Sequence, residues 1–136
     1  MKKILLLMIL SIALISCRRT SINGKLDGMW QLMQKEKVGE GSVDTKEDKI
    51  YYSVKLDLIS IVKSGSDEYL GRFYHSGDSL FLSEFRLQGY NGYLASKEEL
   101  EAYGLSDVSE RFAVETLSSD KMILKSDYSR LYFRKY

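Results

Sequence analysis

The sequence contains no proline, one cysteine and one histidine. A single cysteine excludes a disulfide within the chain, so the fold has to be stabilised by packing. The lone histidine, His75, excludes a metal site built from several imidazoles. The absence of proline, together with ten tyrosines, favours continuous strands over loops or disorder.

The sequence also lacks a large excess of charge of either sign, since it has 20 basic and 19 acidic side chains. Nucleic acid is therefore not expected as a partner, because it would require a basic face or stripe. The 136 residues suit one domain that buries a sizeable core. Nothing in the composition points to a cofactor.

The amino-terminal residues have the order of an export signal. Lys2 and Lys3 precede an apolar run, 4–15, that is too short to span a bilayer, which takes about 20 apolar residues. The segment Leu14-Ile15-Ser16-Cys17 resembles the lipobox of bacterial lipoproteins. Residues 1–16 are thus predicted to be a lipoprotein signal peptide, 17–25 a lipidated tether, and 26–136 the folded domain.

Two other interpretations of the cysteine stay open. Cys17 is an ordinary buried thiol in one of them, and in the other a standard signal peptidase cleaves elsewhere. If cleavage precedes Cys17, loss of Lys2 and Lys3 changes the formal charge from +1 to −1. Several acyl chains on Cys17 would hold the protein on a membrane, whereas one chain alone anchors only marginally.

Alternating apolar and polar residues predict a series of strands. A polar stretch, 35–48, is interpreted as a long hairpin or loop. Apolar residues change parity after Asp57, which predicts a bulge there or burial on both sides. The expected strands cover residues 26–34, 50–58, 69–74, 79–87, 111–117, 121–126 and 130–136.

One short helix interrupts the strands. Ser96 and Glu99 form a capping box, in which each side chain accepts from the backbone amide of the other. Gly104 supplies the left-handed terminator, and Leu105 beyond it is placed to touch Leu100. The expected helix has about two turns.

These elements predict an all-β fold, an up-and-down antiparallel barrel of seven to eight strands with one short helix. Closure removes the free edges that a sheet of this size would otherwise expose. An interior of eight strands is either filled by side chains or holds one small ligand. The alternative is an open sandwich.

The motif Gly28-Met29-Trp30 resembles the Gly-x-Trp motif of lipocalins. The later segments 101–105, 111–121 and 131–136 are similar to small lipocalin-like lipoproteins of Gram-negative bacteria. The resemblance implies that Trp30 packs at the closed end of the barrel with Gly28, and that a basic residue of the last strand lies across it. Arg134 is the first choice for that basic residue, and Lys135 is the second.

Three tyrosines surround the helix and the Asn91-Gly92 turn: Tyr90, Tyr93 and Tyr103. If that region lies over an open mouth, their rings would gate a hydrophobic ligand and offer hydroxyls to its polar end. Alternatively, the rings cover strand edges or pack the helix down. The tyrosines are tentative ligand-binding residues on the first interpretation only.

No catalytic residues are predicted. His75, Ser76 and Asp78 lie in one four-residue turn, where serine and aspartate serve the backbone. The glutamates form no pair that the sequence places across a cleft, so no acid and base can be assigned. An enzyme is not expected.

The expected function is binding by an exported lipoprotein anchored to a membrane through Cys17, with a small apolar molecule or an envelope protein as partner. The competing function is that of a structural or partner-binding lipoprotein whose barrel is filled. Arg18 and Arg19 replace the acidic run that resembles a surface-export signal, which favours the periplasmic face of the outer membrane. Six large residues are expected to decide whether the interior is hollow: Tyr52, Phe73, Phe81, Phe85, Phe112 and Phe133.

Overall fold

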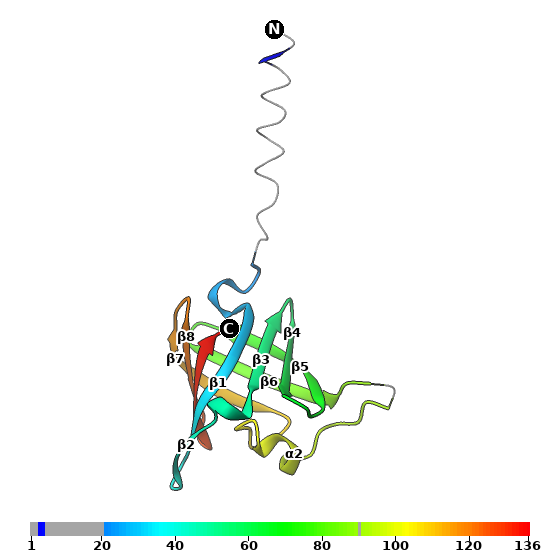
Figure 1. The fold of residues 1–136 in the computed structure, drawn as a ribbon, viewed down its shortest axis with the longest axis vertical. Helices are drawn as coiled ribbons and strands as arrows, with labels where there is room; N and C mark the ends of the chain where they lie inside the picture. Colours follow the sequence, from blue (N-terminus) through cyan, green and yellow to red (C-terminus); the bar gives the residue numbers. More distant parts are fainter. Residues whose placement is uncertain (1–2, 5–20, 90) are drawn as a thin grey trace.

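The computed structural model describes residues 3–4, 21–89 and 91–136 (Figure 1). Cys17 and Tyr90 lie outside these residues. The described elements are η1 (Gly24–Leu26), β1 (Gly28–Lys37), β2 (Gly41–Asp44), η2 (Lys46–Asp48), β3 (Ile50–Lys55), β4 (Leu58–Lys63), β5 (Glu68–Ser76), β6 (Ser79–Leu87), α2 (Lys97–Glu101), β7 (Glu110–Leu117), β8 (Lys121–Lys125) and β9 (Ser129–Lys135).

The strands form an antiparallel sheet that closes on itself. The order β1-β3-β4-β5-β6-β7-β8-β9 returns to β1 through a β1–β9 pairing, which makes an eight-stranded barrel. The additional strand β2 pairs with the second half of β1 and extends away from the barrel (Figure 1). The prediction of an up-and-down antiparallel barrel is confirmed, and the open sandwich is excluded.

One predicted strand is in fact two. Residues 50–58 do not form a bulged strand, because β3 and β4 are joined by a two-residue turn in which Lys55 faces Leu58. The turn explains the change of parity that the sequence shows after Asp57. Val54 and Ile59 are cross-strand partners and both are buried.

Large side chains fill the interior. Trp30, Tyr52, Phe85 and Phe112 are fully buried, and the ring of Phe133 meets Tyr52 edge-on at 4.8 Å between centroids. Such rings pack as in any protein core and leave few voids.

Two of the six residues expected to fill the barrel behave differently. Phe81 faces outward and is 38% exposed, so its assignment to the interior was wrong. Phe73 is only half-buried at the edge of the core.

The barrel has two different ends. The tether end carries residues 21–26, η1 and the β3–β4 turn, whereas the helix end carries α2 and the β1–β2 turn (Figure 1). In the described part of the chain, no helix has the length and apolar character needed to cross a membrane.

The helix begins and ends as the sequence predicted. The Ser96–Glu99 capping box is present, and Gly104 has a φ of +83°. The amide of Leu105 donates to the carbonyl of Leu100 at 3.2 Å, and both leucines are completely buried. A side chain at Gly104 would clash with Leu131, so glycine is required there for space as well as for conformation.

A buried carboxylate ties the chain after α2 to the barrel. Glu110 is 8% exposed and accepts from the amide and hydroxyl of Ser106, both at 3.0 Å, and from the hydroxyl of Ser126 at 2.8 Å. The hydroxyl of Ser129 donates to the carbonyl of Gly104 at 2.7 Å. These bonds fix the cover of the helix end to β7 and β9.

Candidate functional site

A lysine from the last strand covers Trp30 at the tether end. The Nζ atom of Lys135 lies 4.1 Å from the centre of the indole ring, and the indole Nε1–H donates to the carbonyl of Leu26 at 2.9 Å. A cation over an indole face is attractive. The interior is therefore sealed on this side.

Gly28 makes room for that lysine. Its φ is +115°, and a Cβ atom there would lie 3.0 Å from Cε of Lys135. The glycine of the Gly-x-Trp segment thus lets the lysine stem cross to Trp30. Nζ then donates to the carbonyl of Lys25 at 3.0 Å and to that of Asp27.

Arg134 does not take the position that the sequence analysis preferred. The register pairs Trp30 with Lys135 and Gln31 with Arg134, so Lys135 shares the inward face of β9 with Phe133. Arg134 faces outward and donates to the side-chain oxygen of Gln31 at 2.8 Å. The prediction for Arg134 is corrected, and the second choice, Lys135, is the residue on the tryptophan.

Asp27 organises residues 21–27 at this end. Its carboxylate accepts from the hydroxyl of Ser21 at 2.9 Å and from the Asn23 side chain at 2.6 Å. Partial burial alone would raise the pKa of the Asp27 carboxyl. The hydrogen bonds from Asn23 and Ser21 and the charge of Lys135 outweigh that effect and hold this pKa below its ordinary value. Burial lowers the pKa of Lys135, and the negative charge of Asp27 opposes the shift.

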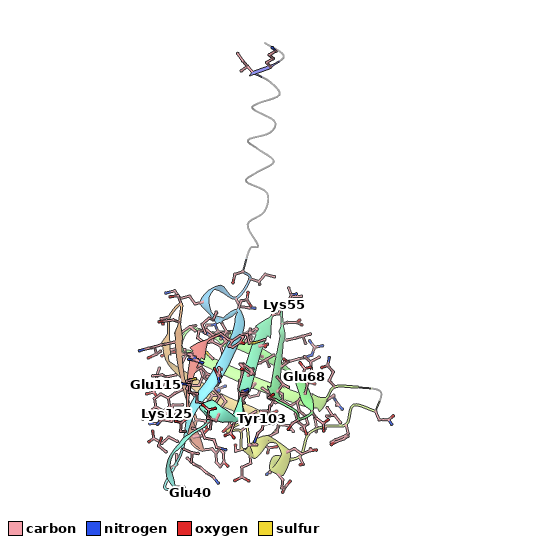
Figure 2. The ribbon with its side chains drawn as sticks, viewed as in Figure 1. Glu40, Lys55, Glu68, Tyr103, Glu115 and Lys125 are labelled. Atoms are coloured by element: carbon pink, nitrogen blue, oxygen red, sulfur yellow. The ribbon has the colours of Figure 1, made fainter. Side chains whose placement is uncertain are left out.

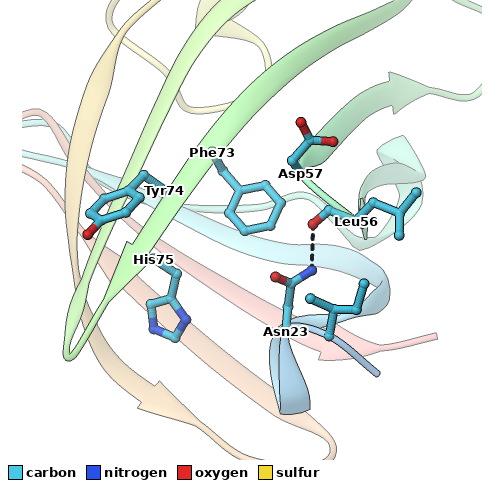
Figure 3. Close-up of a pocket in the computed structure, with 7 residues that line it drawn as sticks. Asn23, Leu56, Asp57, Phe73, Tyr74 and His75 are labelled. Atoms are coloured by element: carbon cyan, nitrogen blue, oxygen red, sulfur yellow. Dashed lines mark hydrogen bonds between the residues drawn. The ribbon is translucent and has the colours of Figure 1, made fainter. Parts of the chain in front are cut away.

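Asn23 connects this loop to the β3–β4 turn. Its side-chain amide donates to the carbonyl of Leu56 at 2.7 Å as well as to Asp27 (Figure 3). Its side-chain oxygen is turned to the side of the groove on which His75 lies (Figure 3). The loop therefore forms a fixed wall rather than a loose end.

A groove of about 560 Å³ opens between this wall, the β3–β4 turn and the end of β5 (Figure 3). The seven residues that line it, called the tether-end groove below, are Ile22, Asn23, Leu56, Asp57, Phe73, Tyr74 and His75. Phe73 and His75 are half-buried and lie on the inward face of β5. Asp57 is held by Arg72, whose Nη1 lies 2.9 Å from the carboxylate.

Leu56 adopts an unusual backbone conformation at the rim of the groove. Its φ is +58°, and it is the first residue of a two-residue turn, where glycine is normally found. An apolar L-residue in this region costs about 1–2 kcal/mol. The side chain is 55% exposed, so packing in the core does not offset that cost.

The groove combines an apolar floor and rim with a few polar groups. Phe73, Leu56 and Ile22 offer apolar surface, while the Asn23 carbonyl oxygen and the His75 imidazole can hydrogen-bond a polar group. Within residues 3–4, 21–89 and 91–136, no cluster of three or more His, Cys, Asp or Glu side chains could hold a metal ion. The arrangement suits binding of an amphipathic molecule.

A family model for the lipocalin-like domain matches residues 9–136. The chain belongs to the lipocalin-like domain family.

Two crystal structures support the fold of this lipocalin-like chain. A lipocalin-like protein from Bacteroides uniformis is 23% identical with a TM-score of 0.65, and the match covers 83% of this chain and all of that one. An uncharacterized protein from Bacteroides eggerthii is 24% identical with a TM-score of 0.56, and the match covers 81% of this chain and 98% of that one. No curated protein matches.

Tyr93 and Tyr103 have different environments at the helix end of the lipocalin-like barrel. Tyr103 is only 4% exposed, packs edge-on against Tyr69 and donates to the carbonyl of Asp67 at 3.2 Å. Tyr93 is 49% exposed and donates to Glu99 at 2.6 Å. Tyr103 therefore packs α2 and the chain after it against the barrel, and its prediction as a ligand-binding residue is corrected. Tyr90 lies outside the described residues.

Most of the tether-end groove was missed in the sequence. His75 was considered only as part of a turn, yet it belongs to β5, and Ser76 and Asp78 do not line the groove. The predicted strand 50–58 includes Leu56, which instead lies in the β3–β4 turn. The available signal was the change of parity at Asp57, which marks a turn and therefore a barrel end.

Proposed function

We propose that this lipocalin-like protein is a membrane-anchored lipoprotein that binds a small, mainly apolar molecule with one polar end in the tether-end groove. The observation that carries the proposal is the contrast between a barrel filled by Trp30, Tyr52, Phe85 and Phe112 and an open groove beside it. Apolar concave sites with a few polar groups are the usual form of small-ligand sites.

The groove suits an apolar ligand better than one other hollow of the surface does. A hollow of about 320 Å³ at the helix end is lined by Lys37, Glu101 and Tyr128 among others, and Lys37 there pairs with Glu101 at 2.9 Å. Its charged side chains already satisfy one another. In the tether-end groove, by contrast, Phe73 and His75 present half-buried faces.

The anchor part of the proposal depends on Cys17. The apolar run 4–15 and the lipobox-like segment before Cys17 support acylation of this residue, and Arg18 and Arg19 favour the periplasmic face of the outer membrane. Replacing Cys17 with alanine is expected to give soluble or uncleaved protein. Fully processed Cys17→Ala protein in the membrane fraction would contradict the anchor.

The binding part is tested with an apolar fluorescent probe such as N-phenyl-1-naphthylamine. Leu56→Asn removes apolar rim surface while asparagine tolerates a positive φ, so probe affinity is expected to fall several-fold. Val38→Asn is the matched control, because Val38 is 65% exposed in the β1–β2 turn at the other end. Equal affinity for the two variants would contradict the groove as the site.

The filled interior also favours a second function, that of an envelope lipoprotein that binds a protein partner and no small molecule. Native mass spectrometry of protein purified from its own host separates the two. A retained small molecule supports the ligand-binding function. A ligand-free barrel that co-purifies with an envelope protein supports the alternative.

A further inference from the structure

Very little chain separates the proposed lipid anchor from the barrel. Only residues 18–20 lie between Cys17 and Ser21, where the described body begins. An extended chain advances at most about 3.6 Å per residue, so Cys17 and Ser21 are no more than roughly 14 Å apart. With acyl chains on Cys17 inserted in a leaflet, the tether end has to lie close to the lipid headgroups.

The side chains exposed at that end suit a lipid surface. Three apolar residues of the tether-end groove, called the groove rim below, are strongly exposed: Ile22 is 71%, Leu56 55% and Tyr74 69% exposed. They come from the tether, the β3–β4 turn and β5, and they surround one opening. Exposed apolar groups collected on one side of a protein mark a contact surface.

Leu56 provides the strongest evidence for such a contact. Lys49, Leu56 and Glu84 are the non-glycine residues with positive φ in the described part of the chain, and Leu56 is the apolar one of the three. A strained backbone that presents an apolar side chain to solvent contributes nothing to the core. Strain of this kind is retained where the side chain has a function.

Charges of both signs lie near the rim. Lys25 and Lys55 are exposed at this end, as Figure 2 shows for Lys55. The carboxylate of Asp57 is paired with Arg72, and that of Asp27 accepts from Asn23. Lys25 and Lys55 can contact anionic headgroups, and the exposed Asp78 of the β5–β6 turn adds a negative charge at the same end.

From the short tether, the exposed rim and the strained turn, we infer that the groove rim lies against the bilayer and that the groove opens toward the leaflet. The inference rests on the proposed anchor at Cys17 and adds an orientation to it. A ligand would then enter from the lipid phase rather than from water.

The test uses the full chain, processed in a bacterial host and reconstituted in vesicles of phosphatidylethanolamine and phosphatidylglycerol. Cys17 is the chain's sole cysteine, so Leu56→Cys and Val38→Cys each provide a single site for an environment-sensitive fluorophore once Cys17 is acylated. Spin-labelled lipids serve as quenchers. The label at Leu56 is expected to be quenched at least threefold more than the label at Val38, which lies at the helix end.

A label at Tyr74→Cys provides a second site on the groove rim, in case the Leu56 substitution disturbs the structure locally. It is expected to be quenched as strongly as the label at Leu56. Equal quenching at the two ends, with both variants folded, overturns the inference while leaving the anchor intact. Mass spectrometry of the amino-terminal peptide shows separately whether Cys17 is acylated. An unacylated Cys17 overturns the anchor of the proposed function, and the orientation with it.

Discussion

The two ends of the barrel differ in how far their apolar side chains are buried. At the helix end, Leu100, Tyr103 and Leu105 are buried, and Glu110 accepts three hydrogen bonds beneath them. At the tether end, Trp30 and Lys135 seal the interior, but Ile22 and Leu56 stay exposed above it beside an open groove.

Because of this difference, we expect the helix end to contribute mainly to stability and the exposed residues of the tether end mainly to binding. Buried side chains with satisfied polar groups contribute to the free energy of unfolding. Exposed apolar groups and a strained turn contribute little to it, and a contact with something outside the chain would account for both. Substitutions at the two ends should therefore change different properties.

The largest effect is expected from Trp30→Ala, which tests whether the tether end is sealed from within. Truncating a buried tryptophan costs about 3–5 kcal/mol of unfolding free energy, and here it also removes the bond to Leu26. Chemical denaturation measures the loss. Unchanged stability would show that Trp30 does not close the barrel.

Glu110→Ala tests the helix end. Loss of a buried carboxylate that accepts from Ser106 and Ser126 is expected to cost about 3 kcal/mol of unfolding free energy, since hydrogen bonds to charged groups contribute about 1.5–3 kcal/mol each and are not additive. Probe binding in the tether-end groove should be unchanged. Glu98→Ala, on the exposed side of α2, is the control and should leave both properties unaltered.

Lys135→Met keeps the aliphatic stem over Trp30 and removes the charge. The lost cation–π contact should cost about 0.5–2 kcal/mol of unfolding free energy and shift the tryptophan emission spectrum. Arg134→Met, one residue away on the outer face, should leave the emission unchanged. The opposite result would restore Arg134 as the cation on the tryptophan.

Acid should loosen residues 21–27 at the tether end. Because the pKa of Asp27 is lower in the folded protein than in the unfolded chain, its contribution to stability is complete above about pH 4, the pKa of an unfolded aspartate, and is lost as the pH falls through the lower folded pKa. Hydrogen exchange should then rise at residues 21–27. Asp27→Asn should show that faster exchange already at neutral pH.

The smallest effect on stability is expected from Leu56→Asn, and the informative result is whether the unfolding free energy rises or falls. Relief of the left-handed strain should raise the unfolding free energy by about 0.5–1 kcal/mol, because asparagine is tolerated at positive φ. Probe affinity should fall in the same variant. A loss of stability would mean that Leu56 packs more than its 55% exposure indicates.

Elements with local signals were predictable from the sequence. The Ser96–Glu99 capping box, the Gly104 terminator and the Gly-x-Trp segment each depend on a few neighbouring residues, and the structure confirms them. The closed barrel followed from the number of strands.

The site depends on contacts between distant residues and was not predictable. Asn23 meets Leu56 across 33 positions, and the register that places Lys135 on Trp30 joins the two ends of the domain. Tyr103 was misplaced because burial of a loop residue depends on its neighbours from other strands. No periodicity within one segment contains this information.

An NMR titration of the chain from Ser21 onward with the apolar probe distinguishes binding in the tether-end groove from binding inside the barrel. Binding in the groove should confine the chemical-shift changes to its lining residues, among them Ile22, Leu56, Phe73 and His75. Changes centred instead on Tyr52, Phe85 and Phe112 would show that the barrel opens to admit the ligand and that the groove is not the binding site.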